Sequence, residues 1–314
     1  MMKEKLLVIV GPTAVGKTAL SIELAKRYDG EVISGDSMQV YKGMDIGTAK
    51  VSLEEQQEIP HHLIDIKDIE DSFSVADFQA KVIPLITALN DKQKLPILVG
   101  GTGLYVNAVI QKYDLVNRPG DKNYRRQLEQ VAIERGTTYL HKQLQELDAK
   151  SAELIHPNNV RRVIRALELT KVLGAPFSEQ QQEEEKDSPY DLVYIALSME
   201  RELLYERINK RVDLMMEQGL LEEVTNLHRQ GIRHCQSIQA IGYKELYQYL
   251  DGEISLDLAI ELLKKNSRHY AKRQLTWFRN KTNAKWFDMT NGLHSDVFFE
   301  ICRFIEGQWT SMAK

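Results

Sequence analysis

A complete phosphate-binding loop near the start of the chain limits the fold more than any other feature. Residues 11–18 read GPTAVGKT and match the pattern G-x-x-x-x-G-K-[S/T] in full. The loop follows an apolar run over residues 6–10 and precedes a stretch with helical character over residues 17–27. A loop set between a buried strand and a helix is typical of an α/β sheet that binds phosphate.

The residue types in this loop suit a phosphate group. Glycines allow backbone N–H groups to turn inward around phosphate oxygens, and the helix that follows adds the positive end of its dipole. Lys17 is expected to bridge phosphate oxygens, and the Thr18 hydroxyl is expected to ligate Mg²⁺, the predicted cofactor. The predicted diphosphate-binding residues are Gly11, Thr13, Ala14, Val15, Gly16, Lys17 and Thr18.

Apolar runs alternate with helical stretches through the first part of the chain. The runs predict buried strands over 6–10, 31–34, 95–99 and 192–197, with weaker candidates at 62–66 and 285–288. Helices are expected over 17–27 and 74–90, and later over 201–219, 240–250 and 255–280. Strands that alternate with helices predict an α/β fold with a doubly wound parallel sheet.

The alternation stops after about residue 114. Residues 115–189 are rich in Glu, Gln, Arg and Leu and have little strand character, so we expect an inserted helical subdomain. Pro119-Gly120 and Ser188-Pro189 mark its two boundaries. The predicted domains are a P-loop core over 1–114 and 190–290, the insertion over 115–189, and a C-terminal helical tail over 291–314.

Net charge and cysteine content limit the functional class and the cellular location that are expected for this chain. The formal net charge is −4, so a polyanion must bind through local basic patches. Cys235 and Cys302 are far apart in the chain, which argues against a disulfide framework and against a zinc site. The first apolar run is too short for a signal peptide, and no stretch reaches the length of a membrane span. We expect a cytoplasmic protein without an obligate protein partner.

The strand over 95–99 lacks the acidic residue that many nucleoside triphosphatases carry at this point. Their Walker-B strand ends in an Asp that fixes Mg²⁺. Here the strand runs into Gly100-Gly101-Thr102-Gly103. The absence of a carboxylate indicates that the loop holds a diphosphate compound rather than ATP.

A second polar motif follows the strand over 31–34. It contains Asp36, Ser37 and Gln39, and the carboxyl end of this strand is expected beside the phosphate-binding loop. In that position Asp36 can act as a general base, and the other two side chains can recognise the polar edge of a substrate. Asp36 can equally do no more than cap a turn. The residue pattern alone leaves both interpretations open.

Several motifs, in the same order along the chain, resemble those of the tRNA dimethylallyltransferases. Besides the phosphate-binding loop they are DSMQVY at 36–41, MDIGTAK at 44–50, GGTGLY at 100–105, NVRRVIRALE at 159–168, R-I-x-x-R at 207–211, IGY at 241–243 and KRQLTWF at 272–278. The resemblance covers residues 5–280, including the insertion. No Cys/His pairs of the zinc-finger kind follow Trp286, so the chain is most similar to the shorter bacterial type.

This resemblance implies a reaction and a set of roles. A dimethylallyl group would pass from dimethylallyl diphosphate to N6 of the adenine just 3′ of a tRNA anticodon, releasing diphosphate. By similarity Asp36 takes the amine proton, Arg211 stabilises the leaving diphosphate, and Thr102 lines the site. The residues expected to meet the extruded adenine are Asp36, Ser37, Met38 and Gln39. The implied partners are dimethylallyl diphosphate and the anticodon stem-loop of tRNA.

Two groups of basic residues are candidates for contact with RNA. Lys265, Arg268, Lys272 and Arg279 recur along one stripe of a predicted helix, with Lys264 and Arg273 beside it, and the insertion carries a second group. A single stripe of this kind is typical of a solvated helix face. Because both groups coincide with family motifs, we expect tRNA contacts from Arg161, Arg162, Arg165, Lys272, Arg273 and Arg279.

Three other functions share parts of this pattern. A P-loop kinase for a small metabolite is disfavoured by the glycine-rich end of the 95–99 strand. A prenyltransferase for free adenine nucleotide is disfavoured by the insertion and the basic groups, which suit a macromolecule. A non-catalytic RNA-binding module would have no use for a complete phosphate-binding loop. The choice of tRNAs, the order of binding, the prenyl chain length and the oligomeric state are left open.

Overall fold

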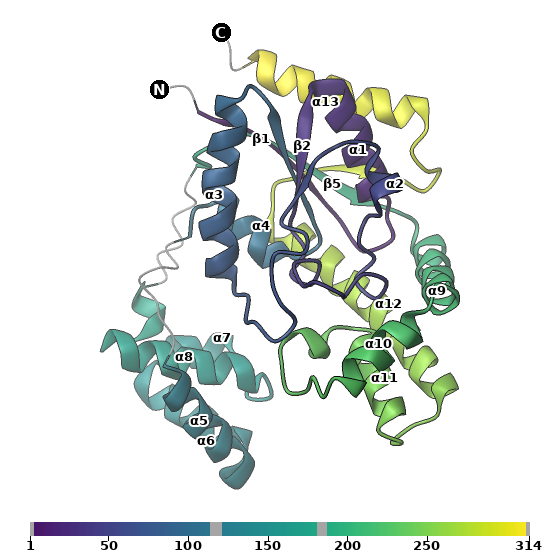
Figure 1. Ribbon diagram of the computed structural model, residues 1–314. Helices are drawn as coiled ribbons and strands as arrows, with labels where there is room; N and C mark the ends of the chain where they lie inside the picture. Colours follow the sequence, from purple (N-terminus) through teal and green to yellow (C-terminus); the bar gives the residue numbers. More distant parts are fainter. Residues whose placement is uncertain (1–2, 114–120, 181–186, 312–314) are drawn as a thin grey trace. The chain divides into compact units, whose positions relative to one another are not determined.

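The computed structural model describes residues 3–113, 121–180 and 187–311. The chain divides into two compact units, one formed by Met1–Lys112 with Ser188–Lys314 and the other by Tyr113–Asp187. The first unit is built on a six-stranded sheet, in which β1, β2 and β5 are labelled in Figure 1. The strand order is β3-β2-β4-β1-β5-β6, and every neighbouring pair is parallel. The strands are β1 (Lys5–Val10), β2 (Gly30–Ser34), β3 (His61–His62), β4 (Leu95–Gly100), β5 (Asp191–Ser198) and β6 (Lys285–Asp288).

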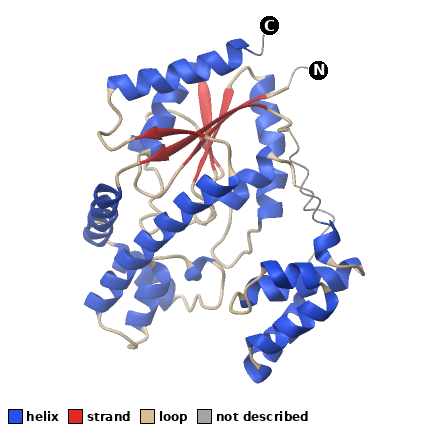
Figure 2. Cartoon of the chain, turned by 180° about the vertical axis from the view of Figure 1, so that it is seen from behind, coloured by secondary structure: helices blue, strands red, loops and turns tan. Residues whose placement is uncertain are grey.

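Helices cover both faces of this sheet (Figure 2). Leu6, Val8 and Val10 of β1 join one core with α3 (Val75–Asp91) and α4 (Gly103–Ile110). Leu7 and Ile9 point the other way, into a core with α1 (Lys17–Tyr28) and α13 (Ser295–Ser311). A sheet buried on both faces has strands that read as continuous apolar runs. This arrangement confirms the predicted doubly wound α/β fold.

The phosphate-binding loop leaves the carboxyl end of β1 and leads directly into α1. Gly11 has a φ of 153°, and a Cβ atom at this position would lie 2.8 Å from the carbonyl oxygen of Leu197 on β5. Only glycine therefore fits between the strand and its neighbour. The rest of the first unit after β5 consists of α9 (Arg201–Glu217), α10 (Leu220–Arg229), α11 (Tyr243–Leu250) and the long α12 (Leu256–Lys281), besides β6 and α13. The short α2 (Leu53–Gln56) lies in the connection before β3.

Three of the expected elements differ from the structure. The strand expected over 62–66 is wrong beyond β3, because Leu63 and Asp65 take φ values of 63° and 55° that end the extended backbone. The helix expected over 201–219 is α9, and Gly219, with a φ of 99°, separates it from the unexpected α10. The helix expected over 240–250 begins only at α11 because Gly242 also has a φ of 99°.

The second unit is entirely helical within its described residues. It contains α5 (Lys122–Arg135), α6 (Thr137–Leu147), α7 (Ala149–Leu154) and α8 (Val160–Leu173), with a small apolar core of its own. It overlaps the insertion expected over 115–189, although the expected boundary at Pro119-Gly120 lies outside the described residues. Across all described residues, the helices are each too short or too polar to cross a membrane.

Candidate active site

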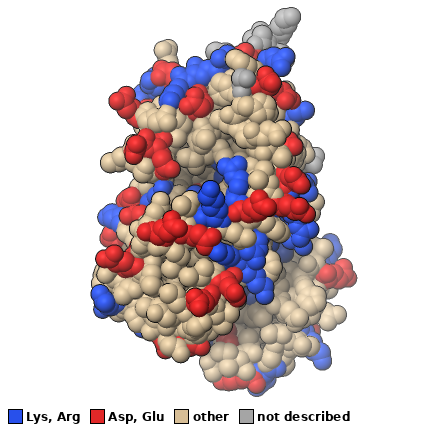
Figure 3. All heavy atoms as spheres, turned by 90° about the vertical axis from the view of Figure 1, so that its right-hand side faces the viewer, with Lys and Arg blue, Asp and Glu red and all other residues tan. Residues whose placement is uncertain are grey.

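A cavity of about 330 Å³ lies in the first unit, beside the phosphate-binding loop. Its polar lining residues are Thr13, Asp36, Ser37, Thr48, Arg211, Gln239, Ser267, Tyr270 and Arg273. Its apolar lining residues are Met38, Ile208, Val212, Met215, Ala240, Ile241 and Leu263, together with Gly47 and Ala49. Figure 3, which looks onto the face that carries α9, shows Lys and Arg side chains gathered around a hollow, with carboxylates on either side.

Two long helices form one side of the cavity. Arg268 of α12 donates to Asn209 Oδ1 of α9 at 2.5 Å, and Lys264 pairs with Asp213 at 2.5 Å. The α9 numbers rise while the α12 numbers fall, so the two helices run antiparallel. Leu263 is 11 residues before Gln274 on α12, which corresponds to about 16 Å along the helix.

The contacts of Gln274 show which end of the cavity lies beside the phosphate-binding loop. Its Oε1 accepts from the N–H of Thr13 in the phosphate-binding loop at 2.9 Å, and its Nε2 donates to the carbonyl of Gly101 at 3.0 Å. Arg211 donates to Thr13 Oγ1 at 3.4 Å, so it also belongs to this end. Met215 lies one helical turn beyond Arg211 on α9 and, like Leu263, away from the loop. The cavity is therefore cationic at the loop and apolar at its far end.

Lys17 lies folded over its own loop. Its Nζ donates to the carbonyls of Gly11 and Pro12 at 3.0 and 2.7 Å. Burial, reinforced by the positive charge of Arg211, lowers the pKa of Lys17 to about 7, and the negative charge of Asp36 opposes this shift. Burial likewise lowers the pKa of Arg211. The site thus concentrates positive charge where desolvation makes that charge costly, an arrangement that favours an anion.

Asp36 follows β2 and borders the cavity, as its sequence position suggested. Its Oδ1 accepts from the N–H groups of Met38 at 2.8 Å and Gln39 at 3.4 Å, so the carboxylate caps a turn. Among the described residues, none forms a hydrogen bond to Oδ2. One oxygen therefore holds the turn, and the other is available to accept a proton.

The neighbours of Asp36 divide into two kinds. Ser37 and Met38 line the cavity. Gln39 does not line it: its Oε1 accepts from Ser34 Oγ at 2.9 Å, and its Nε2 donates to the carbonyls of Thr48 and Ala49. The interpretation of Gln39 as a reader of a base edge is therefore not supported, because the amide that would recognise the base is committed within the protein.

Thr102 stands at the N-cap position of α4, at the loop end of the site. Its Oγ1 is buried and has no hydrogen-bond partner among the described residues. The Tyr270 hydroxyl lies beside it without meeting the geometry of a hydrogen bond. Burial raises the pKa of Tyr270 to about 12, so its hydroxyl stays protonated. A buried hydroxyl without a partner is a candidate for contact with a ligand.

The basic stripe on α12 serves two purposes. Lys264 and Arg268 are used in the contacts with α9, so they are structural. Lys272, Arg273 and Arg279 are exposed, although the Arg279 guanidinium lies 5.6 Å from the Trp286 ring centre. Periodicity along a helix does not reveal which side chains meet a neighbouring helix, so the sequence alone did not separate these two sets.

The basic residues of the second unit also fall into an exposed set and a structural one. Arg161 and Arg162 are exposed on α8. Arg165 donates to the fully buried Glu168 at 2.7 Å, as does Arg125 at 2.8 Å. Arg165 therefore neutralises a buried carboxylate.

Thr18 lies in the first turn of α1 with its side chain exposed. Within the described residues, no group of three or more His, Cys, Asp or Glu side chains could hold a metal ion. The protein therefore offers a hydroxyl at this position rather than a complete set of metal ligands.

Sequence reasoning missed Gln274, which was noted only as part of the 272–278 motif. A signal was present, because Leu263, Ala271 and Phe278 mark the buried face of α12 and Gln274 falls on that face. A buried glutamine needs partners for its amide. Its partners here lie 261 and 173 residues away in the chain, so no local pattern identified them.

Comparison with known proteins identifies the family of this chain. A family model described as IPP transferase matches residues 39–281. A tRNA dimethylallyltransferase of Halalkalibacterium halodurans is 59% identical over 314 residues, covering 100% of both chains. One of Bacillus mycoides is 58% identical over 98% of this chain and 96% of its own.

Two solved structures share the fold. The full-length tRNA isopentenylpyrophosphate transferase of Bacillus halodurans is similar with a TM-score of 0.77 and 57% identity, covering 99% of this chain and 98% of its own. A eukaryotic dimethylallyltransferase described as acting on tRNA has a TM-score of 0.80 and 32% identity, covering 92% of this chain and 74% of its own. The resemblance found in the motifs is confirmed, and this chain belongs to the IPP transferase family.

Proposed function

We propose that this protein transfers a dimethylallyl group from dimethylallyl diphosphate to N6 of the adenine just 3′ of the anticodon in tRNA. The observation that carries the proposal is a single cavity with a phosphate-binding loop and a carboxylate at one end and apolar walls at the other. A prenyl diphosphate has the same division, with two phosphates on an apolar chain. The released product is diphosphate.

In the proposed reaction, the N6 nitrogen forms a bond to C1 of the prenyl group as the C1–oxygen bond breaks. The electron pair of that bond leaves with the diphosphate, and one N6 proton passes to Asp36. The uncommitted Oδ2 of Asp36 is the atom suited to accept it. General-base assistance of this kind contributes about 10²–10⁴-fold in rate.

The leaving diphosphate gains negative charge, and the loop end of the cavity is arranged to stabilise that charge. Lys17 and Arg211 supply two cations, while the amides of the phosphate-binding loop and the amino end of α1 supply aligned dipoles. Thr102 would contact the substrate through its unpartnered hydroxyl. None of these groups has to activate water, which agrees with the absence of a carboxylate after β4.

Mg²⁺ fits this site as an ion whose ligands would come largely from the substrate. The Thr18 hydroxyl is a hard oxygen ligand, and Mg²⁺ in proteins commonly takes its remaining ligands from substrate phosphates and water. Thr18 would hold it, and when bound the ion would neutralise charge on the diphosphate. The absence of an acidic cluster among the described residues is compatible with such shared coordination.

The far end of the cavity suits the prenyl group. Val212, Met215 and Leu263 form an apolar wall there. Along their helices, Met215 lies about one turn from Arg211 and Leu263 about three turns from Gln274. Contacts with methyl groups favour transfer of the group out of water. We assign the dimethylallyl tail to this wall.

The acceptor adenine must leave its stacked position to reach the cavity, at a cost of a few kcal/mol. Ser37, Met38 and Arg273 line the cavity, and we expect the adenine to be bound beside them. Lys272 and Arg279 on α12, and Arg161 and Arg162 on α8, are exposed cations suited to phosphate contacts. Because the acceptor is a tRNA, we expect the activity in the cytoplasm.

The test is transfer of radiolabelled dimethylallyl diphosphate into unmodified tRNA, with AMP as a second acceptor and ATP hydrolysis measured in parallel. Label in tRNA, little label in AMP and no ATP turnover is the expected result. Label in AMP alone keeps the chemistry and overturns the acceptor. ATP turnover without transfer overturns the proposed reaction.

A further inference from the structure

One wall of the cavity is a loop without regular secondary structure. Gly47, Thr48 and Ala49 line the cavity, and residues 44–50 contain neither helix nor strand. A wall of this kind keeps its position only if other parts of the molecule hold its backbone. Its polar contacts are therefore a guide to how the cavity is shaped.

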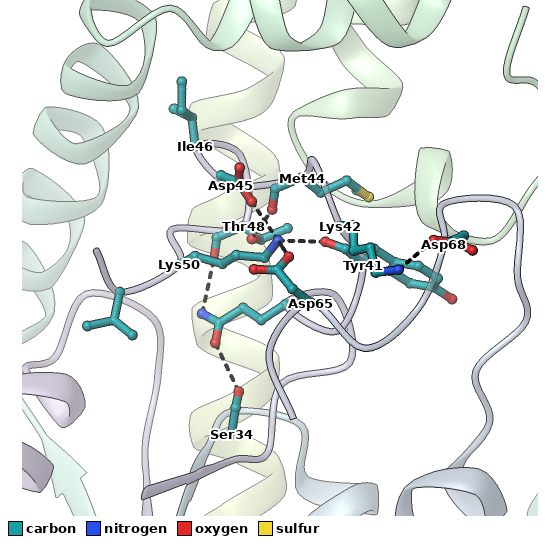
Figure 4. A network of polar contacts seen from close by, with 12 residues as sticks. Ser34, Tyr41, Lys42, Met44, Asp45, Ile46, Thr48, Lys50, Asp65 and Asp68 are labelled. Atoms are coloured by element: carbon teal, nitrogen blue, oxygen red, sulfur yellow. Dashed lines mark hydrogen bonds and ion pairs between the residues drawn. The ribbon is translucent and has the colours of Figure 1, made fainter. Parts of the chain in front are cut away.

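Two side chains tie the loop to the segment that follows β2 (Figure 4). Gln39 donates to the carbonyls of Thr48 and Ala49 at 3.2 and 3.3 Å. Lys50, whose side chain is only 6% exposed, donates to the carbonyl of Tyr41 at 2.6 Å and also pairs with two aspartates. These contacts are local in the chain and fix one side of the loop.

The opposite side is held by one residue from a distant helix. Glu223 of α10 accepts hydrogen bonds from three successive backbone N–H groups, those of Asp45 at 2.8 Å, Ile46 at 2.8 Å and Gly47 at 3.2 Å. A carboxylate that accepts several N–H bonds forms charge-assisted contacts stronger than neutral ones. Its position 176 residues beyond Gly47 means that only the tertiary fold brings the two together.

Tyr243 of α11 completes this attachment. Its hydroxyl donates to Glu223 Oε1 at 2.5 Å, and burial together with the Glu223 charge raises the Tyr243 pKa, so it remains a donor. Its ring lies against the loop, because a Cβ at Gly47 would come within 2.5 Å of a ring carbon. Only glycine allows the backbone to lie this close.

The loop that Glu223 holds lies on the side of the cavity that contains Ser37 and Met38. Through Gln39, the loop is bonded to the segment that contains those residues. Among the described residues, it forms no hydrogen bond to the phosphate-binding loop, which is held instead by Gln274 and Arg211. The phosphate-binding loop and the Gly47–Ala49 wall thus have separate supports.

We infer that Glu223 is a positioning residue for the acceptor: it holds the Gly47–Ala49 wall against which the target adenine is placed. The inference rests on the proposed function for the identity of the acceptor. Glu223 itself does not line the cavity, so it acts through the loop. Because the loop amides lie close to solvent, water can replace a missing carboxylate oxygen, and the protein should stay folded when Glu223 is changed.

The test compares Glu223→Gln with wild type in tRNA transfer and in direct binding of inorganic diphosphate. The amide keeps the size of the side chain but loses the charge and one acceptor. We expect kcat/KM for tRNA to fall at least tenfold, with the diphosphate Kd within twofold of wild type. The matched control is Glu222→Gln, a change of the exposed neighbour on the same helix, which should alter neither quantity.

Two further variants make the outcome decisive. Tyr243→Phe keeps the three amide bonds and should cost less than fivefold, whereas Gly47→Ala should displace the loop from the ring and reproduce the tRNA defect. An unchanged kcat/KM for tRNA in folded Glu223→Gln and Gly47→Ala overturns the inference, as does an equal loss of diphosphate binding. Failure of the wild-type protein itself to modify tRNA overturns the proposed function instead.

Discussion

Asp36 is placed to serve both roles that the sequence left as alternatives. Oδ1 caps the turn after β2, and Oδ2 has no hydrogen-bond partner among the described residues. The cap is observed, and the role as general base stays a prediction. The first role supports the second, because a carboxylate fixed by two backbone N–H groups presents its other oxygen in a defined direction.

Changing Asp36→Asn separates these roles. Asparagine keeps an acceptor oxygen for the turn but cannot take the amine proton at neutral pH. We expect the single-turnover transfer rate to fall by about 10²–10⁴-fold. The affinity for inorganic diphosphate should be equal or higher, since a nearby negative charge is lost. A variant that transfers at the wild-type rate would remove Asp36 from the mechanism.

The lowered pKa of Lys17 predicts how diphosphate binding depends on pH. Without an anion the pKa is about 7, and bound diphosphate raises it by favouring the charged form. Binding therefore takes up a proton between about pH 7 and the higher pKa of the complex. In that interval the affinity should fall as pH rises, by at most about tenfold per pH unit.

Calorimetric titration of inorganic diphosphate in buffers of different ionisation enthalpy measures this proton uptake. The matched variant Lys17→Gln should bind more weakly and lose the Lys17 part of the pH dependence. Titration of the diphosphate itself contributes equally to both proteins and cancels in the comparison. Identical pH slopes for the two would contradict the assignment.

At the scale of elements, α12 connects the two ends of the site. Gln274 contacts the phosphate-binding loop and the end of β4, while Leu263 belongs to the apolar wall. Lys264 and Arg268 fasten the same helix to α9. A single helix thus sets the distance between the loop end of the cavity and its apolar wall.

Gln274→Leu tests the connection to the phosphate-binding loop. Leucine has a similar size but leaves the Thr13 N–H and the Gly101 carbonyl without their partner, at a cost of about 1–3 kcal/mol in the free energy of unfolding. Diphosphate affinity should fall about tenfold, equivalent to about 1.4 kcal/mol. Thr276→Val, at an exposed position on the same helix, is the control. Chemical denaturation and diphosphate titration give the two quantities, and unchanged affinity would sink the idea.

Met215→Ala tests the assignment of the prenyl wall. Removing most of this side chain lengthens the apolar end of the cavity, so geranyl diphosphate should become a better donor relative to dimethylallyl diphosphate. Differences of one methylene change selectivity by about 10–200-fold, so a gain of at least about tenfold in the kcat/KM ratio is expected. Leu214→Ala removes an exposed neighbour and should leave the ratio unchanged. A Met215→Ala protein with wild-type selectivity would place the prenyl tail elsewhere.

At the scale of the whole molecule, an acidic protein must bind a polyanion through a few local cations. The formal net charge is −4, and the exposed candidates are Lys272, Arg273 and Arg279 in the first unit and Arg161 and Arg162 in the second. Each cation that neutralises one phosphate adds to the salt dependence of binding. The contribution of each unit can thus be measured separately.

Lys272→Gln and Arg162→Gln should each weaken tRNA binding and reduce the slope of log K against log salt by about one. Filter binding between about 50 and about 200 mM salt measures the slope. Lys285→Gln, at an exposed position on β6, serves as a control for the loss of one charge. If the control lowers the slope as much as the two variants do, the patches are not specific RNA contacts.

The local parts of this protein could be predicted from its sequence. The strand, loop and helix around Lys17 are contiguous in the chain, so the local residue pattern identifies them. Apolar runs predicted four strands because a sheet covered on both faces excludes water from successive side chains. The family motifs identified the chemistry, and the comparisons with known proteins confirmed the family.

Only the tertiary structure decided which polar side chains are free to act. Gln39, Arg165 and Arg268 looked available in the sequence, but each is bonded to a partner within the protein. Gln274 and Glu223 looked ordinary, yet each holds a wall of the cavity more than 170 residues away. The physical reason is that a hydrogen bond depends on where two groups meet in space, and local sequence patterns carry no information about that meeting.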